Sequence, residues 1–124
     1  MPKKMPKMTK ISITGEFTDL NKYIRAERAN KYAASAIKKK ETQRVIDACR
    51  GIATDFQYPV LIVFEWTTKD KRKDPDNVAF AKKFILDGLV KGGVLDGDSP
   101  KFIEGFRDEF DVDKNACGVL ITIV

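Results

Sequence analysis

The sequence predicts an α+β domain in which helices pack on one face of a small mixed β-sheet. The composition is that of a globular protein, with 43% hydrophobic and 33% charged residues in a chain of 124. Four short segments have the alternating or β-branched character of strands, and the stretches between them have helical periodicity. The predicted order is β-α(α)-β-α-β-β, and we expect residues 1–124 to form one domain.

The N-terminal third predicts a strand followed by helix. Residues 10–15 alternate Ile11 and Ile13 with polar side chains, which indicates the first strand. The preceding residues 1–9 are rich in Lys, Met and Pro, and we expect them to form a flexible arm. Residues 19–51 have helical periodicity. The lysine run 38–40 followed by Thr42, a candidate cap, could join two helices, so the pattern leaves one helix or two open.

The middle of the chain predicts a central strand and a helix. Residues 58–66 (YPVLIVFEW) are β-branched and aromatic, as in a buried strand. A basic tract then leads into Asp74-Pro75-Asp76-Asn77, in which Asp74 suits a helix cap and Pro75 the first turn. This helix should continue to about residue 90, where Gly92 and Gly93 end it.

The C-terminal third predicts two further strands. Residues 101–112 place Phe102, Phe106, Phe110 and Val112 at even positions, which fits one face of a strand. Residues 118–124 (GVLITIV) are apolar on both faces. This last strand therefore belongs either at the centre of the sheet or at a subunit interface.

The composition excludes several classes of function. The chain has no histidine, which removes catalytic triads, histidine-ligated zinc and any imidazole general base. Nothing suggests an organic cofactor. No apolar run is long enough to cross a membrane, and the N-terminus lacks the apolar stretch of a signal peptide, so we expect a cytoplasmic protein. The net charge of +5 favours a polyanionic partner.

Three aspartates are candidate metal ligands. Asp74 and Asp76 lie at a predicted helix start, and Asp98 lies in the loop after that helix. We expect the ends of these neighbouring elements to bring the carboxylates together, as a Mg²⁺ site for phosphodiester cleavage requires. The same motifs are also common as helix caps and turns, which is the alternative interpretation.

One lysine is a candidate catalytic residue. In an uninterrupted helix, Lys83 shares a face with Asp76 and Asp87, where it could stabilise developing negative charge. Alternatively, Lys83 and Asp87 form an ordinary ion pair between successive helical turns.

The stretch KRKDPDNVAFAKKFILDGLVKGGVLDGDSPKFI (residues 71–103) closely resembles the RusA family of Holliday junction resolvases, typically of prophage origin. The family pattern is a basic tract, Asp-x-Asp-Asn, a helix with Lys-x-x-x-Asp-x-Leu, a glycine-containing turn, and Asp before Ser or Gln. Residues 20–31 (LNKYIRAERANK) carry a weaker resemblance, and the order of strands extends the likeness over most of the chain.

The resemblance implies a homodimer that nicks four-way DNA junctions with Mg²⁺ or Mn²⁺ in recombination and repair. It implies that Asp74, Asp76 and Asp98 bind the metal and that Lys83 is catalytic. Two departures leave alternatives open. Asn77 and Lys83 are further apart than in the family, which makes Lys82 a competitor, and Asp96-Gly97-Asp98 replaces adjacent aspartates, which makes Asp96 the alternative ligand.

Basic residues in two segments of the chain are candidates for contacts with DNA phosphates. Those nearest the site are Lys69, Lys71, Arg72 and Lys73, and those on the first helices are Arg25, Arg28, Lys31, Lys38, Lys39, Lys40 and Arg44. The competing functions are a branched-DNA-binding protein of the same fold without catalysis, and a small partner-binding domain with no role in nucleic-acid chemistry.

Overall fold

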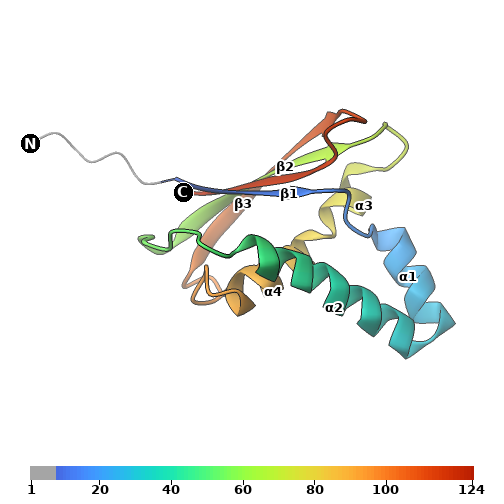
Figure 1. Cartoon of the computed structure of the whole chain (residues 1–124), viewed down its shortest axis with the longest axis horizontal. Coiled ribbons are helices and arrows are strands. Elements are labelled where there is room, and N and C mark those ends of the chain that lie inside the picture. The colour runs from blue at the N-terminus through green and yellow to red at the C-terminus, as the bar shows by residue number, and fades with distance from the viewer. Residues whose placement is uncertain (1–7) are drawn as a thin grey trace, which may run out of the picture.

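A computed structural model describes residues 8–124 and shows a four-stranded mixed sheet with its helices on one face (Figure 1). The strands are β1 (Thr9–Thr14), β2 (Val60–Thr68), β3 (Ile103–Val112) and β4 (Gly118–Ile123), and the helices are α1 (Leu20–Ala29), α2 (Lys31–Ala48), α3 (Pro75–Ala79) and α4 (Lys82–Lys91). The predicted α+β class is confirmed, with one more helix between β2 and β3 than expected.

The last strand lies inside the sheet, not at its edge. The strand order is β1-β4-β2-β3, and β4 runs antiparallel to both β1 and β2. Its Ile121 pairs with Ile11 on one side and with Phe64 on the other. Of the two positions that the sequence allowed for this apolar strand, the structure shows the sheet centre. In contrast, β2 and β3 are parallel, so α3 and α4 form the crossover between them.

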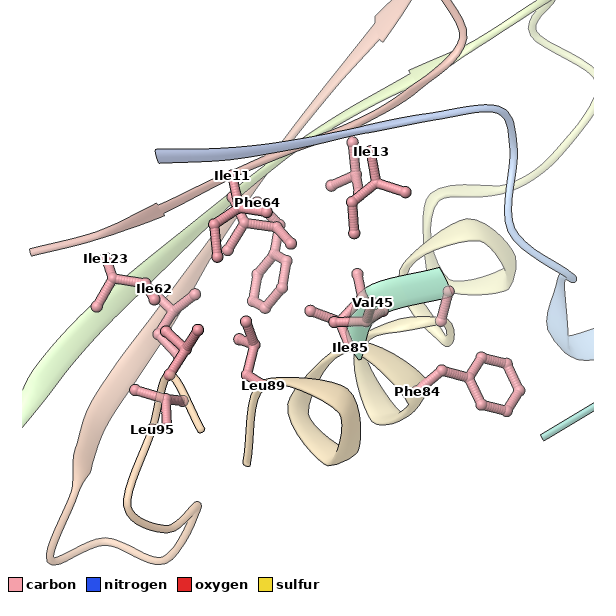
Figure 2. Packing of buried hydrophobic residues seen from close by; sticks show 14 of the residues in the cluster. Ile11, Ile13, Val45, Ile62, Phe64, Phe84, Ile85, Leu89, Leu95 and Ile123 are labelled. Atoms are coloured by element: carbon pink, nitrogen blue, oxygen red, sulfur yellow. The ribbon is translucent and has the colours of Figure 1, made fainter. Parts of the chain in front are cut away.

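The hydrophobic core lies between the sheet and the helices (Figure 2). Ile62 and Phe64 point from β2 into this layer and are fully buried. They meet Ile85 and Leu89 of α4 and Val45 of α2, which are equally inaccessible to solvent. Within residues 8–124 the helices lie on one side of the sheet, and alternate strand residues point away from them toward the other face (Figure 1).

Several predicted boundaries shift for local reasons. β2 begins two residues later than predicted, because Pro59 has no N–H to donate to a strand ladder. β3 begins at Ile103 instead of residue 101. Thr9 belongs to β1 and is buried, so the predicted arm is shorter than expected, and its residues 1–7 lie outside the described residues.

The first helical region contains two helices, and they meet at Asn30. This residue has an extended backbone and its side chain accepts the Ala33 N–H at 2.8 Å, which caps α2. The lysine run and Thr42 were the predicted join, and this prediction was wrong. They lie inside α2, where the lysines face solvent and Thr42 is buried, its hydroxyl lacking a partner within residues 8–124.

The predicted helix over residues 74–90 is also divided. A tight turn at Phe80 and Ala81 separates α3 from α4, and the Lys83 N–H bonds to the Phe80 carbonyl three residues back. Further along, α4 crosses α2 closely at Gly88. A β-carbon there would lie only 2.4 Å from the Val45 Cβ, which explains a glycine inside this helix. Within residues 8–124, none of the helices is apolar over a length that could span a bilayer.

Candidate functional site

Asp74 and Asp76 stand at the exposed start of α3, just beyond the C-terminal end of β2. Asp74 is the N-cap residue by its backbone angles, yet its carboxylate makes no capping hydrogen bond. Asp19 and Asn30, the caps of α1 and α2, both accept such bonds at 2.8 Å. Neither Asp74 nor Asp76 forms a side-chain hydrogen bond or ion pair with any residue in 8–124. The capping interpretation therefore does not account for Asp74.

The segment that carries these aspartates is tied to the loop between β1 and α1. The Lys73 ammonium lies 3.2 Å from an Asp19 carboxylate oxygen and 3.6 Å from one of Glu16. Glu16 also accepts the Lys69 backbone N–H at 3.1 Å, and Asn77 accepts the Asn21 N–H at 3.0 Å. These contacts hold the start of α3 against the N-terminus of α1.

Asp19 is the buried member of this network. Burial acts to raise the pKa of its carboxyl, but the Lys22 N–H and the Lys73 ammonium outweigh burial and hold the pKa below its ordinary value. Asp19 is therefore a carboxylate near neutral pH, as its pairing with Lys73 requires. Lys73 was a predicted DNA contact, but in this structure its ammonium forms ion pairs with Asp19 and Glu16.

Asp98 lies at the opposite end of the sheet from Asp74 and Asp76. The neighbouring Asp96 donates its backbone N–H to the Tyr58 hydroxyl at 3.0 Å, and Tyr58 precedes β2. Asp74 follows the other end of β2, and nine strand residues at about 3.3 Å each separate the two ends by roughly 30 Å. In Figure 1 the loop after α4 lies at the lower left and α3 toward the right.

The three aspartates therefore do not converge within one chain as the sequence analysis expected. Across residues 8–124, no group of three or more acidic, cysteine or histidine residues could hold a metal ion. The physical reason is that β2 and β3 are parallel, so a connection that leaves the end of one strand must return to the start of the next. Replacing Asp98 by Asp96 does not help, because both lie in the same loop.

The two candidate lysines have different environments. The Lys82 ammonium lies 2.6 Å from an Asp108 carboxylate oxygen and sits over the ring of Phe106, 4.8 Å from its centroid. Asp108 also accepts the Trp66 indole N–H at 2.8 Å. Lys83 is exposed and has no ion pair or hydrogen bond through its side chain within the described part of the chain. Of the two, only Lys83 is free to meet a ligand.

The helical face predicted to join Asp76, Lys83 and Asp87 assumed one uninterrupted helix, and that assumption was wrong. The alternative, an ion pair between Lys83 and Asp87, is not seen either. Asp87 lies instead 4.0 Å from the Lys38 ammonium of α2.

The remaining basic candidates divide into internal and exposed groups. Arg44 is internal: it donates to the Thr14 and Gly15 carbonyls, both at 2.9 Å, and contacts Glu41, which is 2% exposed. The exposed group comprises Arg25, Arg28, Lys31, Lys38, Lys39 and Lys40 on α1 and α2, and Lys69, Lys71 and Arg72 before α3. Two members of this group have an acidic neighbour: Lys38 lies 4.0 Å from Asp87, and Arg72 lies 3.7 Å from Asp70.

Sequence reasoning missed Glu16, Asp19 and Glu41 as the partners of these basic side chains. Asp19 was visible only as the start of a helix, and the pairs Glu16–Lys73 and Asp19–Lys73 join residues more than fifty positions apart. Spacing along a single sequence has no signal for such contacts.

No protein-family model matches the chain, and comparison with curated proteins finds no matching relative. The resemblance described above therefore depends on the residues of its motif alone.

Proposed function

We propose that this protein is a Mg²⁺-dependent, structure-selective endodeoxyribonuclease that acts on four-way junctions and other branched DNA in recombination and repair. The observation that carries the proposal is the pair of exposed carboxylates, Asp74 and Asp76, with no partner within residues 8–124. We also propose a cytoplasmic location, where the protein would meet its DNA substrate.

The donor set suits a hard divalent cation. Mg²⁺ prefers oxygen ligands, and one or two carboxylates commonly hold it together with substrate phosphate oxygens. Asp74 and Asp76 would supply such ligands, and Mn²⁺ would take the same oxygens. When bound, the metal would supply Lewis-acid chemistry and activation of water for phosphodiester hydrolysis.

Other side chains would bind and orient the DNA. Lys69, Lys71 and Arg72 are exposed just before the aspartates, where they could contact phosphates beside the scissile bond. Lys83 has a free ammonium at the start of α4, which suits the stabilisation of negative charge on the reacting phosphate. Arg25 and Arg28 on α1 would contact a more distant arm of the junction.

A metal site that uses all three aspartates would have to take Asp98 from a second copy of the chain, because Asp98 and Asp74 lie at opposite ends of β2. A two-fold dimer also suits the substrate, since a four-way junction with two-fold symmetry presents two equivalent strands to cut. We therefore propose a homodimer in which each site combines Asp74 and Asp76 of one copy with the third carboxylate of its partner.

The primary test is nicking of a synthetic four-way junction with Mg²⁺, under single-turnover conditions. We expect the wild type to cut, and Asp74→Asn and Asp76→Asn to bind the junction without cutting it. Asp47→Asn is the matched control, because this exposed carboxylate lies on α2 and already pairs with Arg50. Normal cutting by both site variants would end the nuclease proposal.

Mixing two inactive variants tests the shared site. A heterodimer of Asp74→Asn and Asp98→Asn contains one site with all its carboxylates if Asp98 acts across the dimer. Nicking of one strand per junction should then return in the mixture. A mixture that stays inactive would place Asp98 elsewhere, and full activity of Asp98→Asn with an inactive Asp96→Asn would identify Asp96 as the third ligand.

The absence of a three-carboxylate group within residues 8–124 of one copy also favours a second candidate, a branched-DNA-binding protein without catalysis. This reading expects salt-dependent binding of junctions and no cutting with either Mg²⁺ or Mn²⁺. Failure to bind DNA at all would instead support a partner-binding domain.

A further inference from the structure

The outer edge of β3 carries three exposed apolar side chains, and the rest of the described chain leaves this edge unpaired. β3 pairs with β2 on one side only and is ten residues long. Phe106, Phe110 and Val112 point to the helix side of the sheet but remain 43%, 45% and 40% exposed. β3 has no proline or lysine and is not short, which are three common ways to protect a strand edge. Its one charge on the helix side, Asp108, is paired with Lys82.

The charge of this edge makes DNA an unsuitable occupant. Between residues 103 and 112, the acidic residues Glu104, Asp108, Glu109 and Asp111 outnumber the single basic residue, Arg107. Since phosphates would be repelled here, the exposed aromatic rings call for a protein partner.

We propose that β3 pairs with β3 of a second copy in an antiparallel register centred on Asp108. In this register Phe106 faces Phe110 of the partner subunit, which forms an aromatic cross-strand pair on the helix side. On the open side, Arg107, which lies 3.0 Å from Glu109 of its own chain, also faces the partner subunit's Glu109. Each of these pairs occurs twice because the interface is symmetric.

Neighbouring registers lose this complementarity. Centring on Arg107 places the two arginines opposite each other and sets Phe106 against a carboxylate. Centring on Glu109 opposes two glutamates, and centring on Phe110 sets Glu109 against Asp111. Like charges placed directly opposite one another destabilise strand pairs, so the sequence of β3 selects Asp108 as the axis.

The two axial carboxylates are already neutralised inside each copy. In each copy the Asp108 carboxylate accepts from the Lys82 ammonium at 2.6 Å and from the Trp66 indole N–H at 2.8 Å. The two Asp108 carboxylates at the axis would therefore each be paired within their own copy. The backbone fits as well. The Asp113 N–H bonds toward β2, at the Thr68 carbonyl, and alternation then directs the N–H and C=O groups of the even-numbered residues outward. Asp108 would exchange two backbone hydrogen bonds with its mate.

Charge reversal with measured mass tests this interface. We expect the wild type to be a dimer at micromolar concentration by light scattering, and Arg107→Glu or Glu109→Arg to weaken dimerisation at least tenfold. The double variant Arg107→Glu/Glu109→Arg should dimerise again, since it restores both cross-strand pairs. Lys10→Glu, on the opposite edge of the sheet, is the matched control and should remain a dimer. A monomeric wild type, or single reversals that stay fully dimeric, would overturn the proposal.

Disulfide trapping keeps the test decisive if a reversal variant fails to fold. In a Cys117→Ser background, a mixture of Arg107→Cys and Glu109→Cys chains should crosslink under mild oxidation, because opposed residues of this kind have Cα atoms about 4.5 Å apart. Either variant alone should crosslink far less. Equal crosslinking in all three samples would contradict the register. Light scattering and crosslinking do not depend on catalysis. The interface can therefore be refuted while junction nicking is observed, and it can be confirmed while nicking is absent.

Discussion

The neighbouring lysines of α4 offer a matched pair of substitutions in which one residue supports the fold and the other is available for function. We expect Lys82→Ala to destabilise the protein and Lys83→Ala to leave its stability within about 0.5 kcal/mol. The reason is that Lys82 pairs with Asp108 at 2.6 Å, whereas the side chain of Lys83 is exposed without a partner in residues 8–124.

The magnitude follows from the burial of the pair. Removing one partner of a fully buried ion pair costs about 3–5 kcal/mol, and an exposed pair contributes about 0.2–1 kcal/mol. The side chains of Lys82 and Asp108 are 21% and 25% exposed, so an intermediate cost is expected. The lost contact with the Phe64 and Phe106 rings adds to it. We expect a total of about 2 kcal/mol, or a fall of about 1 M in the urea midpoint.

Urea unfolding followed by tryptophan fluorescence measures this cost directly. Trp66 is the only tryptophan, it stacks on Phe64, and it donates to Asp108, so its emission reports on the same neighbourhood. All variants are compared at one protein concentration, because Asp108 lies on the proposed dimer axis. In single-turnover nicking, Lys83→Ala should lower the rate more than tenfold, at least about 1.4 kcal/mol of transition-state stabilisation. Equal urea midpoints for the two variants, or a Lys82→Ala variant altered only in the salt dependence of DNA binding, would refute the reasoning.

Three further predictions concern other parts of the molecule. Because the pKa of Asp19 is held below its ordinary value, its contribution to stability is present above about pH 4 and is lost as the pH falls through the folded-state pKa; Asp19→Asn should therefore flatten the acid side of a plot of unfolding free energy against pH. Gly88→Ala should destabilise the protein by about 1–3 kcal/mol in urea titration despite the better helix propensity of alanine, since its Cβ would meet Val45 at 2.4 Å, and an unchanged midpoint would show that α2 and α4 can separate without cost. Neutralising Arg25 and Arg28 together should reduce the slope of log binding constant against log salt by about 2 for duplex and junction alike, and an unchanged slope would remove α1 from the DNA interface.

The sequence was informative wherever structure depends on near neighbours. Alternating apolar and polar residues identified β1, because a strand buried on one face has this pattern within a few residues. The β-branched and aromatic run identified β2. It was uninformative about strand direction. Whether β2 and β3 are parallel depends on contacts between distant segments, and that one fact separates Asp98 from Asp74.

The choice between adjacent residues also depends on tertiary contacts. Lys82 and Lys83 have the same chemistry and differ by one position, so only the contact of Lys82 with Asp108 on β3 distinguishes them. The join between α1 and α2 was misplaced for a related reason. A lysine run resembles a linker by composition. Asn30, in contrast, ends α1 by donating its backbone N–H to the Ala26 carbonyl and begins α2 by accepting the Ala33 N–H with its side chain.

The central position of β4 has a consequence for how the chain folds as it is synthesised. β1 joins the sheet only through β4, so the four-stranded sheet cannot be completed until Gly118–Ile123 has left the ribosome. At about 5–20 residues per second, β4 is synthesised on the order of 3–10 s after β2. Until then β2 can pair only with β3, and the edge of β2 that β4 will occupy stays open to chaperones and to other nascent chains. A translation-arrest sensor fused behind the chain should accordingly register pulling force only once β4 has emerged, and force from a chain that ends before β4 would show that an earlier unit folds alone.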